Sequence, residues 1–396
     1  MSDPAHDETD AILSAMEQEI DDIYRRAAKE MHKKSRQYLA WFAETDKNTR
    51  ALYEAGEITQ SEFIQWRISH LMTGSHFALM AKTLSDDMLH SAEIASDIIN
   101  NNMPEIYAIN HNYGTYLIEY GAKVNTNYEL YDVPTVKRLI REKPDLIPMK
   151  SIVKIPEMER WNMNQVSSIM TQGILQGDDI PTLATRISTD LPTRNRNAAI
   201  RDARTMTTSA QNGGREDAYK RGEDMGIEMI ERWVATLDGR TRHAHRVLDG
   251  QKKKVGGTFF YEDYPIRFPG DPQAEPWLVY NCRCTTIAEV KEVGELPESF
   301  DGAFGYSRDD TLGDMTYDEW KADKGNTLLS KSDRNRKDDA KQYYEYRKLI
   351  GKDKMPANIK EFQRIKYTNP NKWVKMKQEA ADERREKAKR KKKVSK

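Results

Sequence analysis

The sequence contains very little cysteine: Cys282 and Cys284 are the only two among 396 residues. Two cysteines cannot build a disulfide framework, so a disulfide-stapled secreted fold is excluded. No apolar stretch approaches the roughly 20 residues that span a bilayer. The start, MSDPAHDETD, has neither the basic nor the apolar segment of a secretory signal. We therefore expect a reduced protein, made in the cytoplasm and without a membrane-spanning segment.

A net charge is also absent, because 63 Lys and Arg residues balance 63 Asp and Glu residues. The two ends of the sequence differ, however. Residues 1–24 contain eight acidic side chains and no Lys or Arg, whereas 384-RREKAKRKKKVSK-396 is mostly basic. This asymmetry is typical of an interaction tail rather than of a general affinity for polyanions.

The basic tail is the candidate surface for nucleic acid. Lys and Arg at this density attract phosphate backbones with a salt-dependent affinity. Contact with double-stranded DNA, without sequence readout, is the most that the tail indicates, and a solvated helix end is the alternative. The candidate residues are Arg384, Arg385, Lys387, Lys389, Arg390, Lys391, Lys392 and Lys393.

Hydrophobic periodicity predicts an α+β protein that is predominantly α-helical. Long amphipathic helices are expected over 1–120, with a capping box at Thr59 and Glu62 and interruptions near Ser85 and Pro104. Composition divides the rest of the chain into four parts. A proline-punctuated connector or small lobe is expected over 121–160, and a helical block leading into a compact α+β module over 161–290, with the module at about 229–290. A linker is expected over 291–315, and a helical region with the basic tail over 316–396.

Glycine and proline mark the expected ends of elements inside 161–290. One helix is expected over 162–176, a second from Asp179 to Leu191, and a third over 194–226 that the pair Gly213 and Gly214 weakens. Strands are expected at MIERWVAT and TFFYEDY, with a short helix or turn at RTRHAHRVL between them. Aromatic residues over 343–373 are spaced for helix packing rather than for stacking on bases.

The first candidate site consists of His243, His245, Cys282 and Cys284. Thiolate sulfur and imidazole nitrogen are the ligands that Zn²⁺ prefers, and four of them close a structural site. The one-residue spacing of the cysteines is shorter than that of most zinc sites. The alternative, which this spacing favours, is a pair of small buried thiols beside one hydrogen-bonded histidine.

The second candidate site is the acidic and basic cluster in 238-DGRTRHAHRVLDG-250. A carboxylate beside a histidine can form a general base, and arginines beside it can hold phosphate. A metal-dependent nuclease acting through Asp238, His245 and the cysteine pair is therefore the alternative function. No nucleophile motif or phosphate loop accompanies the cluster, and no histidine follows Asn281, so a turn fixed by salt bridges is favoured.

The third candidate lies in 201-RDARTMTTS-209, where Arg201 and Arg204 precede a cluster of Ser and Thr. Such a cluster is reminiscent of the Arg–Ser core of ADP-ribosyltransferases. The glutamate motif that those enzymes need does not appear in a suitable place. We interpret the segment as a helix face that makes interhelical polar contacts.

Residues 161–290 resemble the minor head proteins of tailed bacteriophages, whose head-morphogenesis domain is named after protein F of phage Mu and protein seven of phage SPP1. The resemblance is carried in order by GILQGD, AIRDARTMTTSAQNGGREDAYKRG, WVATLDGRTRHAHRVLDGQ, FPGDP and NCRC. His243 is not part of the pattern, and Val279 and Tyr280 replace the His-Pro of many relatives. The matching positions are Trp233, Asp238, Arg240, Thr241, Arg242, His245, Asp249, Gly250, Asn281, Cys282, Arg283 and Cys284.

The resemblance implies a structural virion protein without a known catalytic activity. It implies a place inside the head at the portal vertex, contact with the portal protein, and scaffold or major capsid protein as further partners. It also implies a role in head assembly, DNA packaging or DNA ejection. No cofactor is expected, with His245, Cys282 and Cys284 as the remaining candidates for zinc. We expect NCRC to lie against the DGRTRHAH turn, with Asn281 and Arg283 bonded to Asp238 or Asp249.

Overall fold

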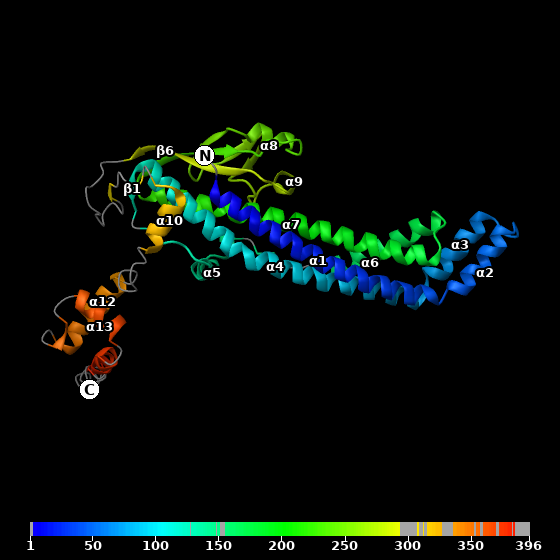
Figure 1. Cartoon of the computed structure of the whole chain (residues 1–396), viewed down its shortest axis with the longest axis horizontal. Coiled ribbons are helices and arrows are strands. Elements are labelled where there is room, and N and C mark those ends of the chain that lie inside the picture. Colours follow the sequence, from blue (N-terminus) through cyan, green and yellow to red (C-terminus); the bar gives the residue numbers. More distant parts are fainter. Residues whose placement is uncertain are drawn as a thin grey trace, which may run out of the picture. The chain divides into compact units, whose positions relative to one another are not determined.

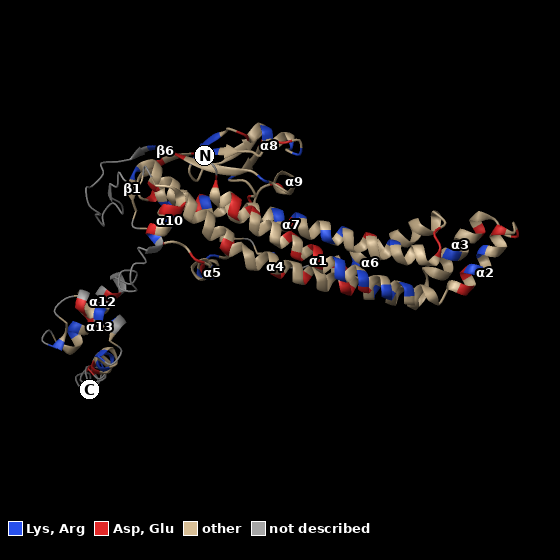
Figure 2. Cartoon of the chain, in the orientation of Figure 1, with Lys and Arg blue, Asp and Glu red and all other residues tan. Residues whose placement is uncertain are grey.

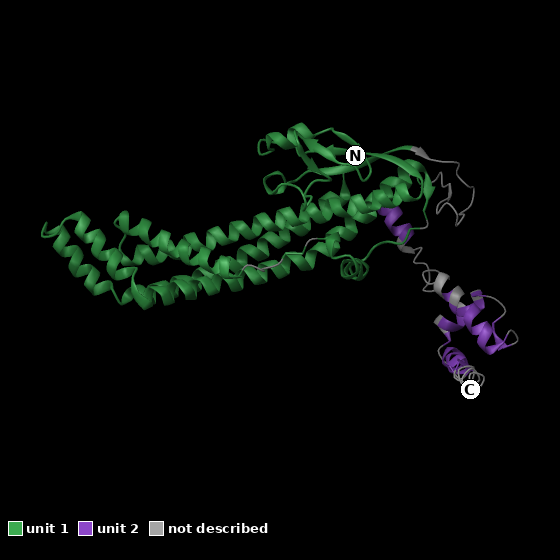
Figure 3. Cartoon of the chain, turned by 180° about the vertical axis from the view of Figure 1, so that it is seen from behind, with its two compact units in different colours: residues 1–317 green, residues 318–396 purple. Residues whose placement is uncertain are grey.

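The computed structural model divides the chain into two compact units, 1–317 and 318–396 (Figure 3). The residues that it describes are 3–126, 128–147, 149–150, 155–293, 307–308, 312, 315–326, 336–351, 354–356, 359–369, 372–381 and 383–384. The segment MKSIVKI, for which an extended conformation is expected, lies largely outside them.

The first unit is built around a bundle of long helices, with an α+β module beside it (Figure 1). Its helices are α1 (Pro4–Ala40), α2 (Ala43–Glu54), α3 (Gln60–Leu71), α4 (Gly74–Ala122), α5 (Val133–Glu142), the 3₁₀ turn η1 (Pro144–Leu146), α6 (Ile155–Leu175), α7 (Ile180–Asp224), α8 (His243–Leu248) and α9 (Pro276–Val279).

The bundle core is formed by α1, α4, α6 and α7, whose apolar faces meet along most of their length. At about 1.5 Å per residue, the 49 residues of α4 extend over roughly 70 Å. The second half of α4 is buried on nearly every side, from Met103 to Glu119, which identifies it as the central helix of this region.

Three expected helix breaks, near Ser85, at Pro104 and after Leu191, are wrong, and the reason is tertiary packing. Helix α4 continues through Ser85 and Pro104, and both residues are buried in the bundle. Helix α7 continues through Pro192 and through the pair Gly213 and Gly214. Packing against neighbouring helices outweighs the local preference of these residues to end a helix.

The predicted capping box at Thr59 is confirmed, and two further helices begin at an aspartate cap. Thr59 and Glu62 form both hydrogen bonds of a capping box at the start of α3. Asp132 accepts from the N–H of Thr135 at the start of α5, and Asp179 accepts from that of Thr182 at the start of α7. These caps satisfy backbone donors that a helix cannot satisfy itself.

The module contains a three-stranded antiparallel sheet with the order β3-β2-β6. The expected strand TFFYEDY is in fact a two-stranded hairpin of β4 and β5. A further pair, β1 and β7, joins residues from the expected connector and the expected linker. The strands are β1 (Val124–Asn125), β2 (Ile227–Val234), β3 (Lys252–Lys254), β4 (Phe259–Tyr261), β5 (Tyr264–Ile266), β6 (Thr285–Val293) and β7 (Ser307–Arg308).

The loop that carries FPGDP packs directly on α7. Gly270 has a φ of +79°, and a Cβ added there would lie 2.6 Å from the backbone nitrogen of Ser209. Only glycine combines this left-handed conformation with so close an approach of two backbones. The loop therefore fixes the module against the middle of α7.

The second unit has its own small aromatic core. Its helices include α10 (Tyr317–Asn326), which begins at the boundary, α12 (Arg336–Ile350) and α13 (Ile359–Thr368), and residues 372–381 are also helical. Tyr343, Tyr346 and Phe362 are buried in this core, which confirms that the aromatic spacing serves helix packing. Of the basic candidates for DNA contact, only Arg384 lies within the described residues, and it pairs with Glu345 at 2.6 Å.

Basic and acidic residues are interspersed along the helices of the bundle (Figure 2). Several of them link neighbouring helices; for example, Arg204 of α7 binds Glu17 of α1 at 2.6 Å. In the described part of the chain, no helix is both long enough and apolar enough to cross a membrane.

Candidate metal centre and its supporting contacts

The candidate centre forms where α8 meets the loop between α9 and β6. Cys282 and Cys284 lie in that loop, just before β6 begins, and not on a strand. His245 lies in α8, between β2 and β3. Since β2 pairs with both β3 and β6, the sheet brings the two segments together.

The side chains of His245, Cys282 and Cys284 converge in the module core, with 4%, 2% and 2% of their surface exposed. Nδ1 of His245 lies 3.3 Å from Sγ of Cys284 and 3.8 Å from Sγ of Cys282. All three candidate ligand atoms lie within 4.8 Å of one another. The structure therefore assembles three of the four residues of the first candidate site.

The fourth residue, His243, does not join them. Its side chain is exposed on α8 and makes an edge contact with the ring of Tyr261, at 6.4 Å between centroids. Residues two apart on a helix point in different directions, so His243 and His245 cannot share one site. A four-ligand zinc site with His243 is therefore wrong.

The hydrogen bond that Nε2 of His245 makes determines the tautomer of the ring. Nε2 lies 2.7 Å from the carbonyl oxygen of Leu278, which can only accept, so Nε2 carries the hydrogen and donates. Arg242 lies 3.0 Å from the same nitrogen and donates to the carbonyl oxygens of Trp277 and Leu278 at 2.7 and 3.2 Å. The lone pair of Nδ1 consequently points at the two sulfurs.

The two thiols differ in their acidity. A hydrogen bond from Cys282, together with one from Trp233, lowers the pKa of Cys284. Burial raises the pKa of Cys282, and the neighbouring Cys284 raises it further. The pair therefore favours one thiolate, on Cys284, with the Cys282 thiol as its donor.

The expected proximity of NCRC to the DGRTRHAH turn is confirmed by a bidentate ion pair. Arg283 donates to both carboxylate oxygens of Asp238, at 2.7 and 2.8 Å. This pair, with the backbone N–H of Arg240 at 2.8 Å and the hydroxyl of Thr241 at 3.1 Å, holds the pKa of Asp238 well below its usual range. The Asp238 carboxylate therefore stabilises the turn and is not available as a base.

The other residues of the motif also have structural contacts. Asp249 accepts from the backbone N–H of Ala235 at 2.8 Å. Gly250 has a φ of +76° and donates its N–H to the carbonyl of Trp233 at 2.9 Å. Asp238 and Asp249 are therefore bonded to the turn and the strand, and neither is hydrogen-bonded to the ring of His245. The Asp–His general base of the nuclease alternative is not assembled.

The expected bond from Asn281 to Asp238 or Asp249 is wrong. Asn281 has a φ of +51°, and its backbone N–H donates to the hydroxyl of Thr205 on α7 at 3.2 Å. The left-handed residue turns the chain towards α7 before the first cysteine. Asparagine tolerates this conformation better than most residues.

The interpretation of 201-RDARTMTTS-209 as an interhelical face is confirmed. Arg204 binds Glu17 of α1, and Arg201 stacks on the ring of Tyr280 at 5.0 Å. Thr208 donates to the carbonyl oxygen of Cys282. The hydroxyls of this face therefore hold the cysteine loop on α7.

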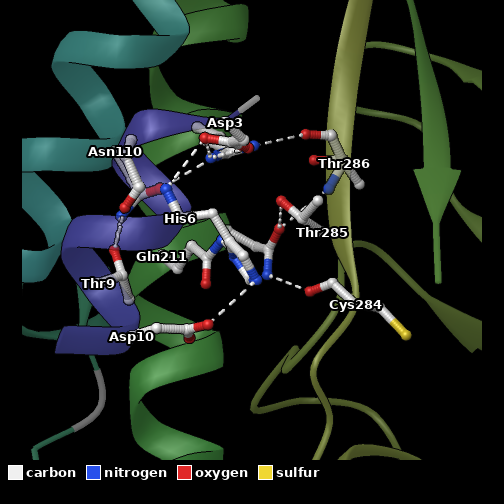
Figure 4. Close-up of polar contacts among 12 residues, drawn as sticks. Asp3, His6, Thr9, Asp10, Asn110, Gln211, Cys284, Thr285 and Thr286 are labelled. Atoms are coloured by element: carbon white, nitrogen blue, oxygen red, sulfur yellow. Dashed lines mark hydrogen bonds and ion pairs between the residues drawn. The ribbon is translucent and has the colours of Figure 1, made fainter. Parts of the chain in front are cut away.

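A buried polar network that the sequence does not predict joins α1, α4, α7 and the start of β6 (Figure 4). Asn212 donates to the carbonyl of Cys284 at 3.2 Å and accepts from the N–H of Thr286 at 3.1 Å. Arg215 binds both carboxylate oxygens of Asp3, at 2.9 and 2.6 Å, and donates to Asn110 at 3.1 Å. A Gln-Asn-Gly-Gly-Arg run in a helix shows only that polar residues cluster, and not which distant segments they meet.

Comparison with known proteins finds a family model that matches the part of the chain in which this site lies. Residues 164–287 match the family model described as "Phage Mu protein F like protein". Over 326 residues, 80% of the chain aligns with 94% of the minor head protein GP7 of Bacillus phage SPP1, at 23% identity. The DGRTRHAH turn, the cysteine loop and the whole of α7 fall inside the matched residues. No solved structure matches the chain.

A second relative carries an enzyme name. Over 165 residues the chain is 30% identical to the NAD(+)–arginine ADP-ribosyltransferase EFV of Enterococcus faecalis (strain ATCC 700802 / V583). The match covers 41% of this chain and 31% of that protein, so this chain spans about a third of its length. The activity in that name is a property of that protein.

Proposed function

Because the chain belongs to the phage minor head proteins that share the Phage Mu protein F like domain, we propose that it is built into the inside of the head beside the portal. There it acts as a structural part of the head, in its assembly and in the packaging or ejection of DNA. The observation that carries the proposal is the alignment with nearly the whole of the SPP1 minor head protein.

The geometry of the motif supports a structural role. The Asp238 carboxylate forms an ion pair with Arg283. His245 and the two cysteines are buried in the module core. The groups that would do chemistry are thus bonded to one another rather than presented to a substrate. Substrate sites, by contrast, are concave and present a few convergent polar groups.

The surface that we assign to the portal lies at the end of the bundle that α2 and α3 occupy, away from the module (Figure 1). Trp41 and Leu79 are 78% and 64% exposed there, and Trp41 lies 5.0 Å from the ring of His76. These residues border a shallow hollow of about 280 Å³ between α1 and α4. Exposed aromatic and apolar side chains at one place mark an interaction surface.

Co-expression with the portal protein tests this assignment. We expect the full chain to co-purify with the portal, and Trp41→Glu combined with Leu79→Glu to reduce recovery at least tenfold, or about 1.4 kcal/mol. The matched control is Val247→Glu, because Val247 is 45% exposed on α8 in the module. Equal recovery of all three proteins would reject the surface, and no recovery of the wild type would reject the portal contact itself.

The basic tail is assigned to DNA as a separate contact. Binding through Lys and Arg to phosphates releases counterions, so the affinity should fall steeply with salt. Changing five of the six lysines of the tail to glutamine, at Lys387, Lys389, Lys391, Lys392 and Lys393, should reduce the salt dependence of a gel shift with duplex DNA. An unchanged salt dependence would exclude the tail as the DNA contact.

A further inference from the structure

We propose that His245, Cys282 and Cys284 bind one zinc ion, which cross-links α8 to the loop before β6. The two sulfurs lie 37 and 39 residues after the histidine in the sequence. An ion between them would therefore close the module at the point where its sheet, its short helix and α7 meet.

The distances suit a tetrahedral ion. Bonds of about 2.3 Å to sulfur and about 2.0–2.1 Å to nitrogen place the nitrogen and each sulfur about 3.6 Å apart. The observed distances from Nδ1 of His245 to the sulfurs of Cys284 and Cys282 are 3.3 and 3.8 Å. The ligand atoms already have nearly the separations that zinc requires.

The histidine is oriented as zinc-bound histidines are. Metal-ligating imidazoles commonly donate their other N–H to a carboxylate or a backbone carbonyl, which fixes the tautomer. The carbonyl oxygen of Leu278 has this role, at 2.7 Å from Nε2. The free lone pair of Nδ1 is then available to the ion rather than to solvent.

The sulfurs are surrounded by donors. The backbone N–H of Cys284 lies 3.5 Å from Sγ of Cys282. The indole N–H of Trp233 is buried beside Cys284 and has no nitrogen or oxygen partner in the described part of the chain. The guanidinium of Arg242 is held next to the histidine. Such donors and positive charge stabilise thiolates, the form of cysteine that binds metal.

The ligand set and its burial determine the kind of site. Two thiolates and an imidazole favour zinc over Mg²⁺ or Ca²⁺, which take oxygen ligands. Among the described residues, no fourth His, Cys, Asp or Glu joins the three, so water would complete the tetrahedron. Because every ligand residue is at least 96% buried, a substrate cannot reach the ion, and its role is structural.

The test is the metal content of the full chain, purified without chelator and dialysed against zinc-free buffer. Inductively coupled plasma mass spectrometry should find about one zinc per chain, as expected for a structural site. Cys282→Ser and Cys284→Ser should each lower this at least tenfold. His243→Gln is the matched control, since His243 lies two residues from His245 and outside the cluster, and it should keep the metal.

Replacement of zinc by Co²⁺ in the wild-type chain gives a readout that does not depend on the variants. Sulfur-to-cobalt charge transfer and the visible bands of a tetrahedral ion are expected. Wild-type protein without zinc, zinc retained equally by both serine variants, or a cobalt spectrum without the sulfur band would each overturn the proposal. If the serine variants do not fold, the cobalt spectrum of the wild type decides between binding and buried thiols. The portal and DNA experiments can succeed or fail independently of this result.

Discussion

The adjacent glycines of α7 give a prediction in which one position serves as the control for the other. A Cβ added at Gly214 would lie 2.6 Å from the carbonyl oxygen of Tyr107 and 3.1 Å from the backbone nitrogen of His111, both in α4. A Cβ added at Gly213 would find its nearest atom at 3.8 Å, the edge of the Tyr107 ring. Only Gly214 is therefore required for the close contact between α4 and α7.

The two alanine variants should change stability in opposite directions. In a helix interior, Gly→Ala gains up to about 1 kcal/mol, so Gly213→Ala should be stabilised by roughly that amount. Gly214→Ala has the same gain, but the added carbon meets backbone that cannot rotate away. Overpacking of this kind costs about 1–3 kcal/mol, which outweighs the gain, so the variant should be destabilised by up to about 2 kcal/mol.

Urea unfolding followed by far-ultraviolet circular dichroism measures the difference. The midpoint of Gly213→Ala should lie above that of the wild type, and the midpoint of Gly214→Ala below it. Because both variants share the helix-propensity gain, the expected separation between them is the overpacking cost of about 1–3 kcal/mol. If both variants shift the midpoint in the same direction and to the same extent, the close packing of α4 on α7 is refuted.

Three further predictions concern the junction of the module with the bundle. Asn212→Ala leaves the carbonyl of Cys284 and the N–H of Thr286 without their partner, and should lower the free energy of unfolding by about 2–3 kcal/mol in urea titrations; exposed Asn197→Ala on the same helix should change it little. Asp238→Asn should destabilise at neutral pH. Because the folded pKa of Asp238 is depressed, the difference from wild type should begin to shrink as the pH falls through the ordinary aspartate value of about 3.9, and should vanish only below the folded pKa, where both side chains are neutral. A difference that does not shrink as the pH falls contradicts the ion pair. Burial and the neighbouring Glu216 raise the pKa of Glu231, so the stability that this carboxyl contributes is present at low pH and is lost as the pH rises above the ordinary glutamate value of about 4.3. Glu231→Gln should remove this pH dependence of thermal unfolding. An unchanged profile would show that other groups cause the pH dependence.

What the sequence predicts well is local. The caps at Thr59, Asp132 and Asp179 depend on side chains within three residues, so composition and spacing suffice to find them. The strand β2 and the short helix α8 follow in the same way from alternation and from turn residues. The Arg283–Asp238 pair was predicted because a shared motif already joins its two segments.

What the sequence could not predict depends on contacts between distant segments. Pro104 and Pro192 would end isolated helices, and only burial in the bundle keeps α4 and α7 continuous. Asn281 turns towards α7 because its backbone is left-handed, which residue type alone does not reveal. The approach of Arg215 to Asp3 likewise appears only once the chain is folded.

A structural component of the phage head must be present in the particles that it helps to build. Quantitative mass spectrometry of gradient-purified procapsids and mature particles measures this directly, with the portal protein as the internal standard. We expect peptides of this chain in both preparations, at a few copies per portal and in constant ratio to it. Absence of the chain from procapsids and mature particles alike would contradict its place in the head.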